Sequence, residues 1–90
     1  MSNNYALTLV LKNDLEEKER KALLESITKR FGKLEKEELW GSRDLAYPIK
    51  HQTKGFYAHY LFASEAKDIA PLDKAVKIEE DIIRYLLVRV

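Results

Sequence analysis

One stretch of the chain shows which strand can lie at the edge of a sheet: residues 40–50 read WGSRDLAYPIK. Gly41 and Pro48 both weaken a strand, because glycine has no side chain to pack and proline cannot donate a ladder hydrogen bond. The stretch therefore predicts an edge strand with a bulge or bend at Gly41, which also protects the edge from nonspecific pairing. Three residues alternate along it and share one face, on which the tyrosine ring is expected to fill the core: Leu45, Tyr47 and Ile49.

The segments on either side of this strand carry patterns of both kinds of secondary structure. Apolar residues recur at every second position in the predicted strands and at helical spacing in the predicted helices. Residues 50–55 read KHQTKG and are typical of a polar hairpin tip. In chain order, the predicted elements are a strand at 5–11, a helix at 14–31, a strand at 34–49, a strand at 56–63, a helix from about 69 and a strand at 81–90.

The helix boundaries are predicted from capping residues. Asp14 is the expected N-cap of the first helix, with Glu17 as its capping-box partner, and Gly32 is the expected stop. For the second helix, Asp68 as N-cap places Pro71 in the first turn, where the missing N–H costs little.

The order β-α-β-β-α-β predicts an α+β fold of the ferredoxin-like type over a single domain, residues 1–90. In this fold, a four-stranded antiparallel sheet carries both helices on one face. The first and third strands are central, and the second and fourth strands are edges. Pro48 fits this topology, because proline in a strand is tolerated chiefly at an edge.

The composition limits the classes of function. The chain has no cysteine, so it can form neither a disulfide nor a thiolate metal site. It has no run of apolar residues long enough for a membrane span and no signal-peptide pattern, so a cytoplasmic protein is expected. With 16 Lys and Arg against 15 Asp and Glu, the net charge is +1, so nucleic acid would be bound through local patches or beside a more basic partner.

Two alternative functions find little support in the residues. An enzyme, cofactor or metal site is not predicted, because the glycines are scattered and His51 and His59 have no metal-ligand spacing. An RNA recognition motif would share the topology, and Lys54, Gly55 and Phe56 begin its third-strand pattern. The pattern then fails at residues 57–59. Strand parity also places Phe56 and Ala58 on the core face, whereas the motif would expose them.

The stretch at 40–50 resembles the W-G-x-R-x-L-A-Y-P-I signature of the bacterial small-subunit ribosomal protein six family. The wider pattern agrees over nearly the whole chain: a tyrosine opens the first strand, glycine and aromatics follow the hairpin, and residues 78–89 look like the family's last strand. The signature is matched at eight positions: Trp40, Gly41, Arg43, Leu45, Ala46, Tyr47, Pro48 and Ile49.

The resemblance implies a structural protein of the cytoplasmic bacterial ribosome, with no catalysis and no cofactor. It implies binding to the central domain of small-subunit ribosomal RNA, as a heterodimer with small-subunit protein eighteen. Two features depart from the family: residues 1–4 lack its frequent basic residues, and the sequence stops at Val90, where many members continue into a tail. RNA or partner contacts from those two segments are therefore not expected. The alternative is a ferredoxin-like RNA- or protein-binding module outside the ribosome.

Two surfaces are candidates for the protein partner, and the residues leave both open. One is the bend at Trp40 and Arg43, since exposed tryptophan and arginine are enriched at interface hot spots. The other is the sheet face that the helices leave uncovered, which is more apolar than solvation requires. By strand parity, that face carries Ala6, Thr8, Val10, Tyr57, His59, Leu61, Leu86 and Val88.

The candidates for RNA contacts are basic residues on or near the sheet edges. Such side chains usually contact phosphates and fix position rather than sequence. Arg43 is the strongest candidate, because a family signature position and the predicted bend coincide there. The full set is Arg43, Lys50, His51, Lys54, Arg84 and Arg89.

Overall fold

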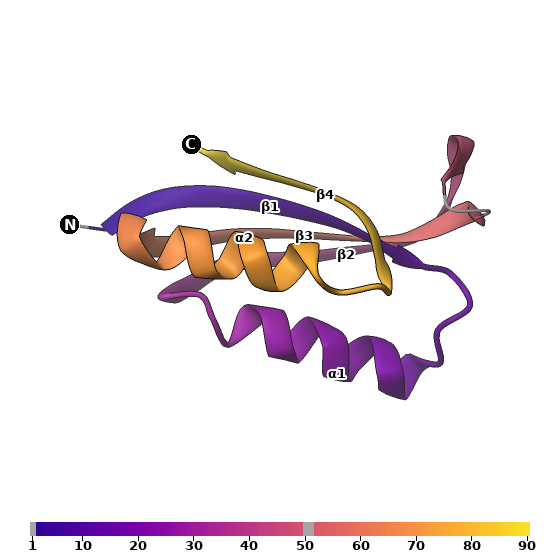
Figure 1. Ribbon diagram of the computed structural model, residues 1–90, viewed down its shortest axis with the longest axis horizontal. Coiled ribbons are helices and arrows are strands. Elements are labelled where there is room, and N and C mark those ends of the chain that lie inside the picture. The colour runs from indigo at the N-terminus through magenta and orange to yellow at the C-terminus, as the bar shows by residue number, and fades with distance from the viewer. Residues whose placement is uncertain (1, 50–51) are drawn as a thin grey trace.

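The computed structural model describes residues 2–49 and 52–90, and its elements follow the predicted order (Figure 1). Both helices lie on one side of a single antiparallel sheet, which confirms the ferredoxin-like fold. The elements are β1 Ser2–Lys12, α1 Glu17–Thr28, β2 Lys33–Ile49, β3 Gln52–Glu65, a short 3₁₀ turn Ala66–Asp68, α2 Ile69–Lys77 and β4 Ile82–Arg89.

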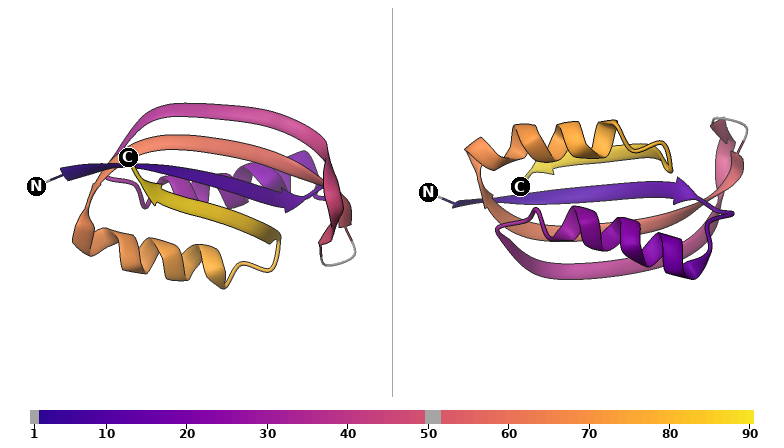
Figure 2. Two further views of the ribbon diagram at one scale, coloured as in Figure 1. Left: turned by 90° about the horizontal axis from the view of Figure 1, so that it is seen from above. Right: turned by 60° about the horizontal axis from the view of Figure 1, so that its bottom comes forward.

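The sheet has the strand order β2-β3-β1-β4, so β1 and β3 are central and β2 and β4 are edges, as predicted. Figure 2 shows the strands side by side in this order, with α1 behind the sheet and α2 along the β4 edge. The helices therefore cover one face of the sheet, and the opposite face, here called the open face, has no covering element in the part of the chain that the structure describes.

The core lies between the sheet and the helices and follows the predicted period of two. In β1 the odd-numbered positions from Tyr5 to Leu11 point into it, and in β3 Ala58, Tyr60 and Phe62 do so. The ring of Phe31 stacks on that of Phe62 with centroids 3.9 Å apart. The helices add their apolar stripes: Leu23, Leu24, Ile27, Leu72 and Val76.

The start of α1 differs from the prediction. Glu16, not Asp14, is the N-cap, and its backbone N–H donates a hydrogen bond to Oε1 of Glu19 at 3.3 Å. The helix begins later because Leu15 packs against the core from the preceding loop. By contrast, α2 begins at Ile69 as predicted, although Asp68 caps it without a side-chain hydrogen bond.

Gly32 does not end α1, because the helix stops at Thr28 and its C-cap is Lys29. Glycine is required at position 32 for a different reason. A Cβ atom there would stand 2.6 Å from the carbonyl oxygen of Ala63 in the adjoining end of β3. The Gly32 N–H also donates to Oγ of the buried Ser64 at 2.8 Å, so this glycine joins β2 closely to β3.

Strand β2 contains the predicted bulge. Leu39 pairs with Ala58 and Gly41 with Tyr57, so Trp40 is the extra residue. Gly41 has φ +83°, a left-handed conformation that favours glycine. The bulge changes the parity of the strand, because residues after it meet β3 one position later.

The second half of β2 corrects the predicted core. Pairing with β3 is interrupted between Asp44 and Ile49, and the ends of β2 and β3 turn away from the helices (Figure 1). We call residues 43–49 and 52–55 the hairpin arm. Tyr47 lies on this arm and is 61% exposed, so the expectation that its ring fills the core was wrong. Pro48 lies in the interrupted region, where no ladder hydrogen bond is lost.

Replacing Tyr47 by alanine should therefore change the free energy of unfolding by no more than about 0.5 kcal/mol, as is usual for exposed positions. Pro48→Ala should be equally mild. Tyr60→Ala is the matched control, because Tyr60 is fully buried, and it should cost about 3–5 kcal/mol. Urea melts in which Tyr47→Ala is as costly as the control would show that the arm packs onto the core in solution.

The hydroxyl of Tyr60 is buried and has no hydrogen-bond partner among the residues that the structure describes. Burial raises the pKa of Tyr60 above its ordinary 10.0, and the nearby carboxylate of Glu37 adds to the rise by its charge. Because the unfolded chain releases this proton at lower pH than the folded chain, stability should fall as the pH rises above about 10. Tyr60→Phe should be neutral or stabilising by about 1 kcal/mol near pH 7, and should reduce the loss at high pH.

The measurement is a series of urea melts between pH 7 and pH 11, with Tyr57→Phe as the control. Tyr57 lies on the same strand but on the half-exposed open face. An equal effect of both substitutions on the alkaline loss would contradict the assignment to Tyr60.

Candidate functional site

The open face is organised in rows that run across the four strands. Directly opposite residues of neighbouring strands point to the same side, so the register defines each row. From β3 through β1 to β4, three of these rows are Tyr57, Val10 and Arg84; His59, Thr8 and Leu86; and Leu61, Ala6 and Val88. The structure thus places on this face every residue that strand parity predicted for it. Two of these residues, Val10 and Ala6, are buried among their neighbours.

Trp40 joins the two surfaces that were predicted as alternatives. Its ring lies on the open face beside the bulge, where it stacks on His59 with centroids 5.3 Å apart and on Tyr57 at 6.4 Å. The guanidinium of Arg43 lies over the Trp40 ring, 5.5 Å from the ring centroid. The bend and the apolar sheet face therefore form one continuous surface, with Trp40 still 39% exposed.

Polar contacts hold the aromatic cluster in place. His59 Nδ1 and the Thr8 hydroxyl are 2.8 Å apart, and Trp40 Nε1 donates to Oε2 of Glu38 at 2.9 Å. This indole hydrogen bond, together with Lys36, lowers the pKa of Glu38 below its usual value. Nζ of Lys36 lies 3.0 Å from Oε1 of Glu38, so this ion pair balances the negative charge on the β2 side of the surface.

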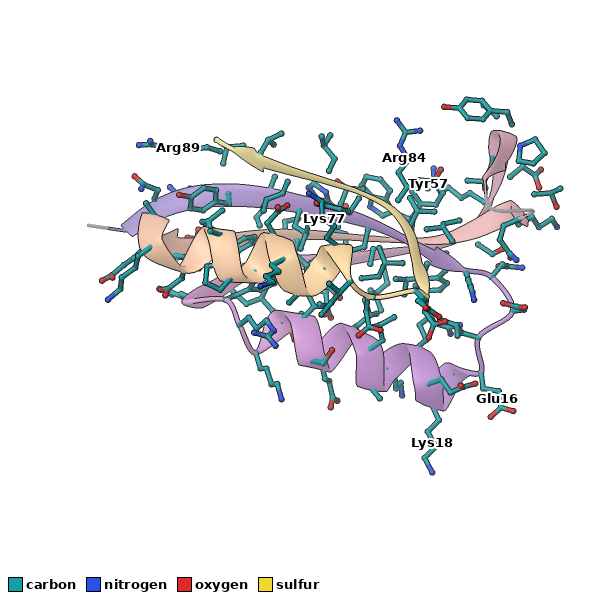
Figure 3. All side chains as sticks on the ribbon, viewed as in Figure 1. Glu16, Lys18, Tyr57, Lys77, Arg84 and Arg89 are labelled. Carbon is teal, nitrogen blue, oxygen red and sulfur yellow. The ribbon has the colours of Figure 1, made fainter. Side chains whose placement is uncertain are left out.

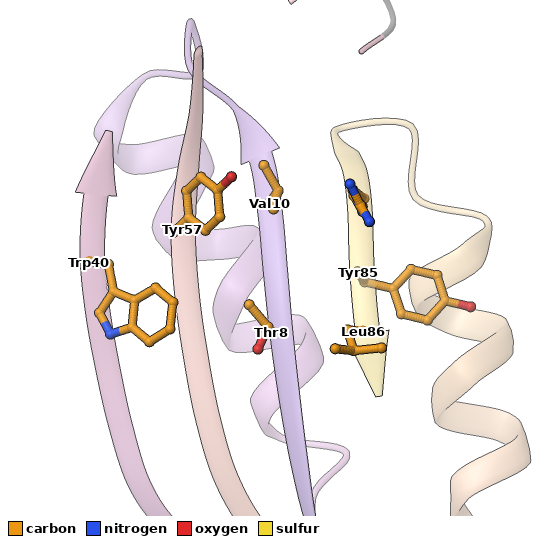
Figure 4. Close-up of a pocket in the computed structure, with 7 residues that line it drawn as sticks. Thr8, Val10, Trp40, Tyr57, Tyr85 and Leu86 are labelled. Atoms are coloured by element: carbon orange, nitrogen blue, oxygen red, sulfur yellow. The ribbon is translucent and has the colours of Figure 1, made fainter. Parts of the chain in front are cut away.

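A groove of about 290 Å³ lies in this surface (Figure 4). Its sides come from Trp40 on one edge strand and from Arg84 and Leu86 on the other, and its floor is formed by Thr8, Val10 and Tyr57. The side chain of Tyr85 turns away toward α2, where its hydroxyl donates to Oδ1 of Asp73 at 2.7 Å. This hydrogen bond fixes β4 to α2 and raises the pKa of Tyr85.

The predicted RNA-binding residues do not gather in one cluster. Arg84 lies near the hairpin arm, whereas Arg89 lies at the C-terminal end of β4 and donates to Oδ1 of Asn3 (Figure 3). Lys54 on the arm is 4.0 Å from the carboxylate of Asp44. Among the members of this set that the structure describes, only Arg43 and Arg84 border the aromatic cluster and the groove. Lys50 and His51 lie outside the described residues.

Two residues of the site were missed by the sequence analysis. Tyr47 reaches back from the arm, and its hydroxyl lies 3.5 Å from Nη1 of Arg84. Glu38 anchors the indole of Trp40. The alternation of Glu38 with Trp40 could have placed both on one face, but no local signal shows that the arm curves toward β4.

Within residues 2–49 and 52–90, no three His, Cys, Asp or Glu side chains come together in a way that could hold a metal ion. The helices of this part of the chain are also too short or too polar to cross a membrane. The open face is an apolar and aromatic surface with arginines at its border. Such a surface is suited to binding a macromolecule.

Comparison with known proteins identifies the family. Residues 4–89 match the family described as Ribosomal protein S6. The chain belongs to the ribosomal protein S6 family. This confirms the resemblance seen in the signature at 40–50 and in the wider pattern over nearly the whole chain.

Relatives in the S6 family cover the chain from end to end. The small ribosomal subunit protein bS6 of Alkaliphilus metalliredigens is 36% identical, over 98% of this chain and 97% of its own length. That of Caldanaerobacter subterraneus is also 36% identical, over 96% of this chain and 95% of its own. The crystal structure of 30S ribosomal protein S6 from Thermotoga maritima superposes with a TM-score of 0.93 at 25% identity, covering all of this chain and 89% of that one.

Proposed function

We propose that this protein is a structural constituent of the bacterial small ribosomal subunit, which binds central-domain small-subunit ribosomal RNA together with small-subunit protein eighteen. The observation that carries the proposal is membership in the S6 family over residues 4–89. A location on the cytoplasmic ribosome follows from that membership. The role is structural rather than catalytic.

The open face is the proposed site for protein eighteen. Support comes from its composition and position: it is the side of the sheet without helices, and Leu86 and Val88 remain exposed on it at 62% and 40%. An antiparallel sheet face in water is normally polar, so a contiguous apolar surface favours a protein partner. Trp40, Arg43 and Tyr57 supply the residue types that dominate binding energy at interfaces. Val10, His59 and Leu61 complete the proposed contact surface.

The RNA contacts are proposed at basic residues around this surface. Arg43, Lys54, Arg84 and Arg89 are at least partly exposed and could reach phosphates, and Lys50 and His51 remain candidates from the sequence alone. These groups are few and dispersed, and the net charge is only +1. Binding of polyanionic RNA by this protein alone should therefore be weak, because few counterions would be released.

We expect the isolated protein to bind a central-domain RNA fragment no more tightly than about 10⁻⁶ M near physiological salt, with little sequence preference. The preformed mixture with protein eighteen should bind at least about 100-fold more tightly, because the partner adds phosphate contacts to those made by this protein. Filter-binding titrations of each protein and of the mixture provide the measurement. Nanomolar, sequence-specific affinity of the isolated protein would contradict the prediction.

Association with the ribosome can be tested in the source bacterium. An affinity-tagged copy of the protein should sediment with the small ribosomal subunit in sucrose gradients, at about one copy per subunit. The alternative, a module that acts outside the ribosome, predicts that the tagged protein stays at the top of the gradient. That result would refute the proposed function.

A further inference from the structure

The groove on the open face combines an apolar floor with an arginine that has no acidic partner. Val10 and Tyr57 form part of the floor, and Arg84 stands at the side. Arg84 contacts the neutral hydroxyl of Tyr47, and it forms no ion pair with any carboxylate of the described part of the chain. An exposed guanidinium beside an apolar surface is able to form a bidentate hydrogen bond with an incoming anion.

The size of the groove limits what can occupy it. At about 290 Å³ it is at the lower end of the range for small-molecule sites, about 300–1,000 Å³. It is also open to the rest of the apolar face, where Leu86 continues toward Val88. One or two side chains of a docked polypeptide fit this description better than an enclosed ligand does.

The apolar floor of the groove favours a protein over a nucleic acid. The carboxylate of Glu38 is paired with Nζ of Lys36 at 3.0 Å and with the indole of Trp40, so its charge is balanced within the surface. A phosphate backbone that contacted Arg84 would leave the apolar floor at Val10 and Tyr57 unfilled. A polypeptide can match the floor and the arginine together, by placing an apolar side chain in the groove and a single carboxylate at Arg84.

We propose that the groove is the specificity-determining subsite of the partner interface: it takes an apolar side chain of protein eighteen, and Arg84 pairs with an aspartate or glutamate of the same segment. The inference rests on the proposed function and adds the chemistry of the segment that docks. Tyr47 is a positioning residue, because its hydroxyl holds the guanidinium over the groove. This gives the exposed tyrosine of the arm a role in binding rather than in folding.

The test is calorimetric titration of protein eighteen into this protein in the absence of RNA. Arg84→Ala should weaken the heterodimer by about 30-fold or more, since removing one partner of an interface charge pair leaves the other uncompensated. Arg84→Lys should restore only part of the affinity, because lysine cannot form the bidentate contact. Arg30→Ala is the control, because Arg30 is an exposed arginine just beyond the end of α1 and is not part of the open face. This variant should bind like the parent.

A charge swap identifies the carboxylate. Each aspartate and glutamate of protein eighteen is changed to arginine, and one such variant should bind Arg84→Glu more tightly than it binds the parent. Arg84→Ala with parental affinity would overturn the inference while the parent heterodimer still supports the proposed function. If Arg84→Ala binds protein eighteen like the parent but binds RNA more weakly, Arg84 contacts a phosphate. That result would also overturn the inference. Failure of the parent to bind protein eighteen would instead refute the proposed partnership, and this inference with it.

Discussion

Replacing Phe62 by alanine should cost about 4 kcal/mol of folding free energy. Phe62 is fully buried, and its ring stacks on Phe31 at 3.9 Å and on Tyr5 at 5.7 Å, so truncation removes contacts with β1 and with the segment that follows α1, and leaves a cavity. A loss of this size is a large fraction of the stability of a 90-residue domain. Urea denaturation followed by circular dichroism provides the measurement.

Tyr57→Ala is the matched control for this prediction. It removes an aromatic side chain of similar size from the same strand, but from the open face, and should cost about 1 kcal/mol. The reverse ranking of the two variants would mean that β3 is displaced by one residue, because such a shift exchanges the two faces of a strand.

Leu61→Glu should abolish the heterodimer, with at least a 100-fold loss of affinity for protein eighteen. Leu61 lies in the middle of the open face, between Lys36 and Ala6 of the neighbouring strands. A carboxylate there would have to leave water and be buried against the partner, which is costly even with Lys36 on the neighbouring strand. In the free protein the same carboxylate stays in contact with water, so unfolding should remain cooperative and stability should change by about 1 kcal/mol.

Leu39→Glu separates loss of the interface from a general effect of added charge. Leu39 is 53% exposed and pairs with Ala58, which points into the core, so it lies on the helix side of β2. This variant should bind protein eighteen as the parent does. If both variants bind normally, the open face is not the interface. If both lose binding, added charge rather than the face is responsible.

The central strands could be predicted well because one of their faces must be buried. In β1 and β3 that requirement imposes an unbroken period of two, so the alternation from Tyr5 to Leu11 and from Phe56 to Phe62 gives both the strands and the faces. The topology followed from the order of the elements, and Gly41 and Pro48 indicated the edge.

Strand β2 was harder to predict, because parity is reliable only where pairing is continuous. The bulge at Gly41 adds one residue, and the break in pairing after Asp44 frees the arm from the sheet. Tyr47 was therefore assigned to the core, although it stands in solvent and contacts Arg84. Trp40 was assigned to the bend, with the open face as a separate candidate surface, although its alternation with Glu38 puts both residues on one face; the stacking of Trp40 on His59 joins the two surfaces.

The most direct test of our account places a photoreactive phenylalanine derivative at position 57, in the middle of the open face, in protein that has been incorporated into small ribosomal subunits. A second copy carries the same group in place of Lys18, which projects from the far side of α1 (Figure 3). Our account predicts that position 57 crosslinks to protein eighteen and that position 18 does not. Crosslinking to protein eighteen from position 18 alone would place the partner on the helical side and contradict the account.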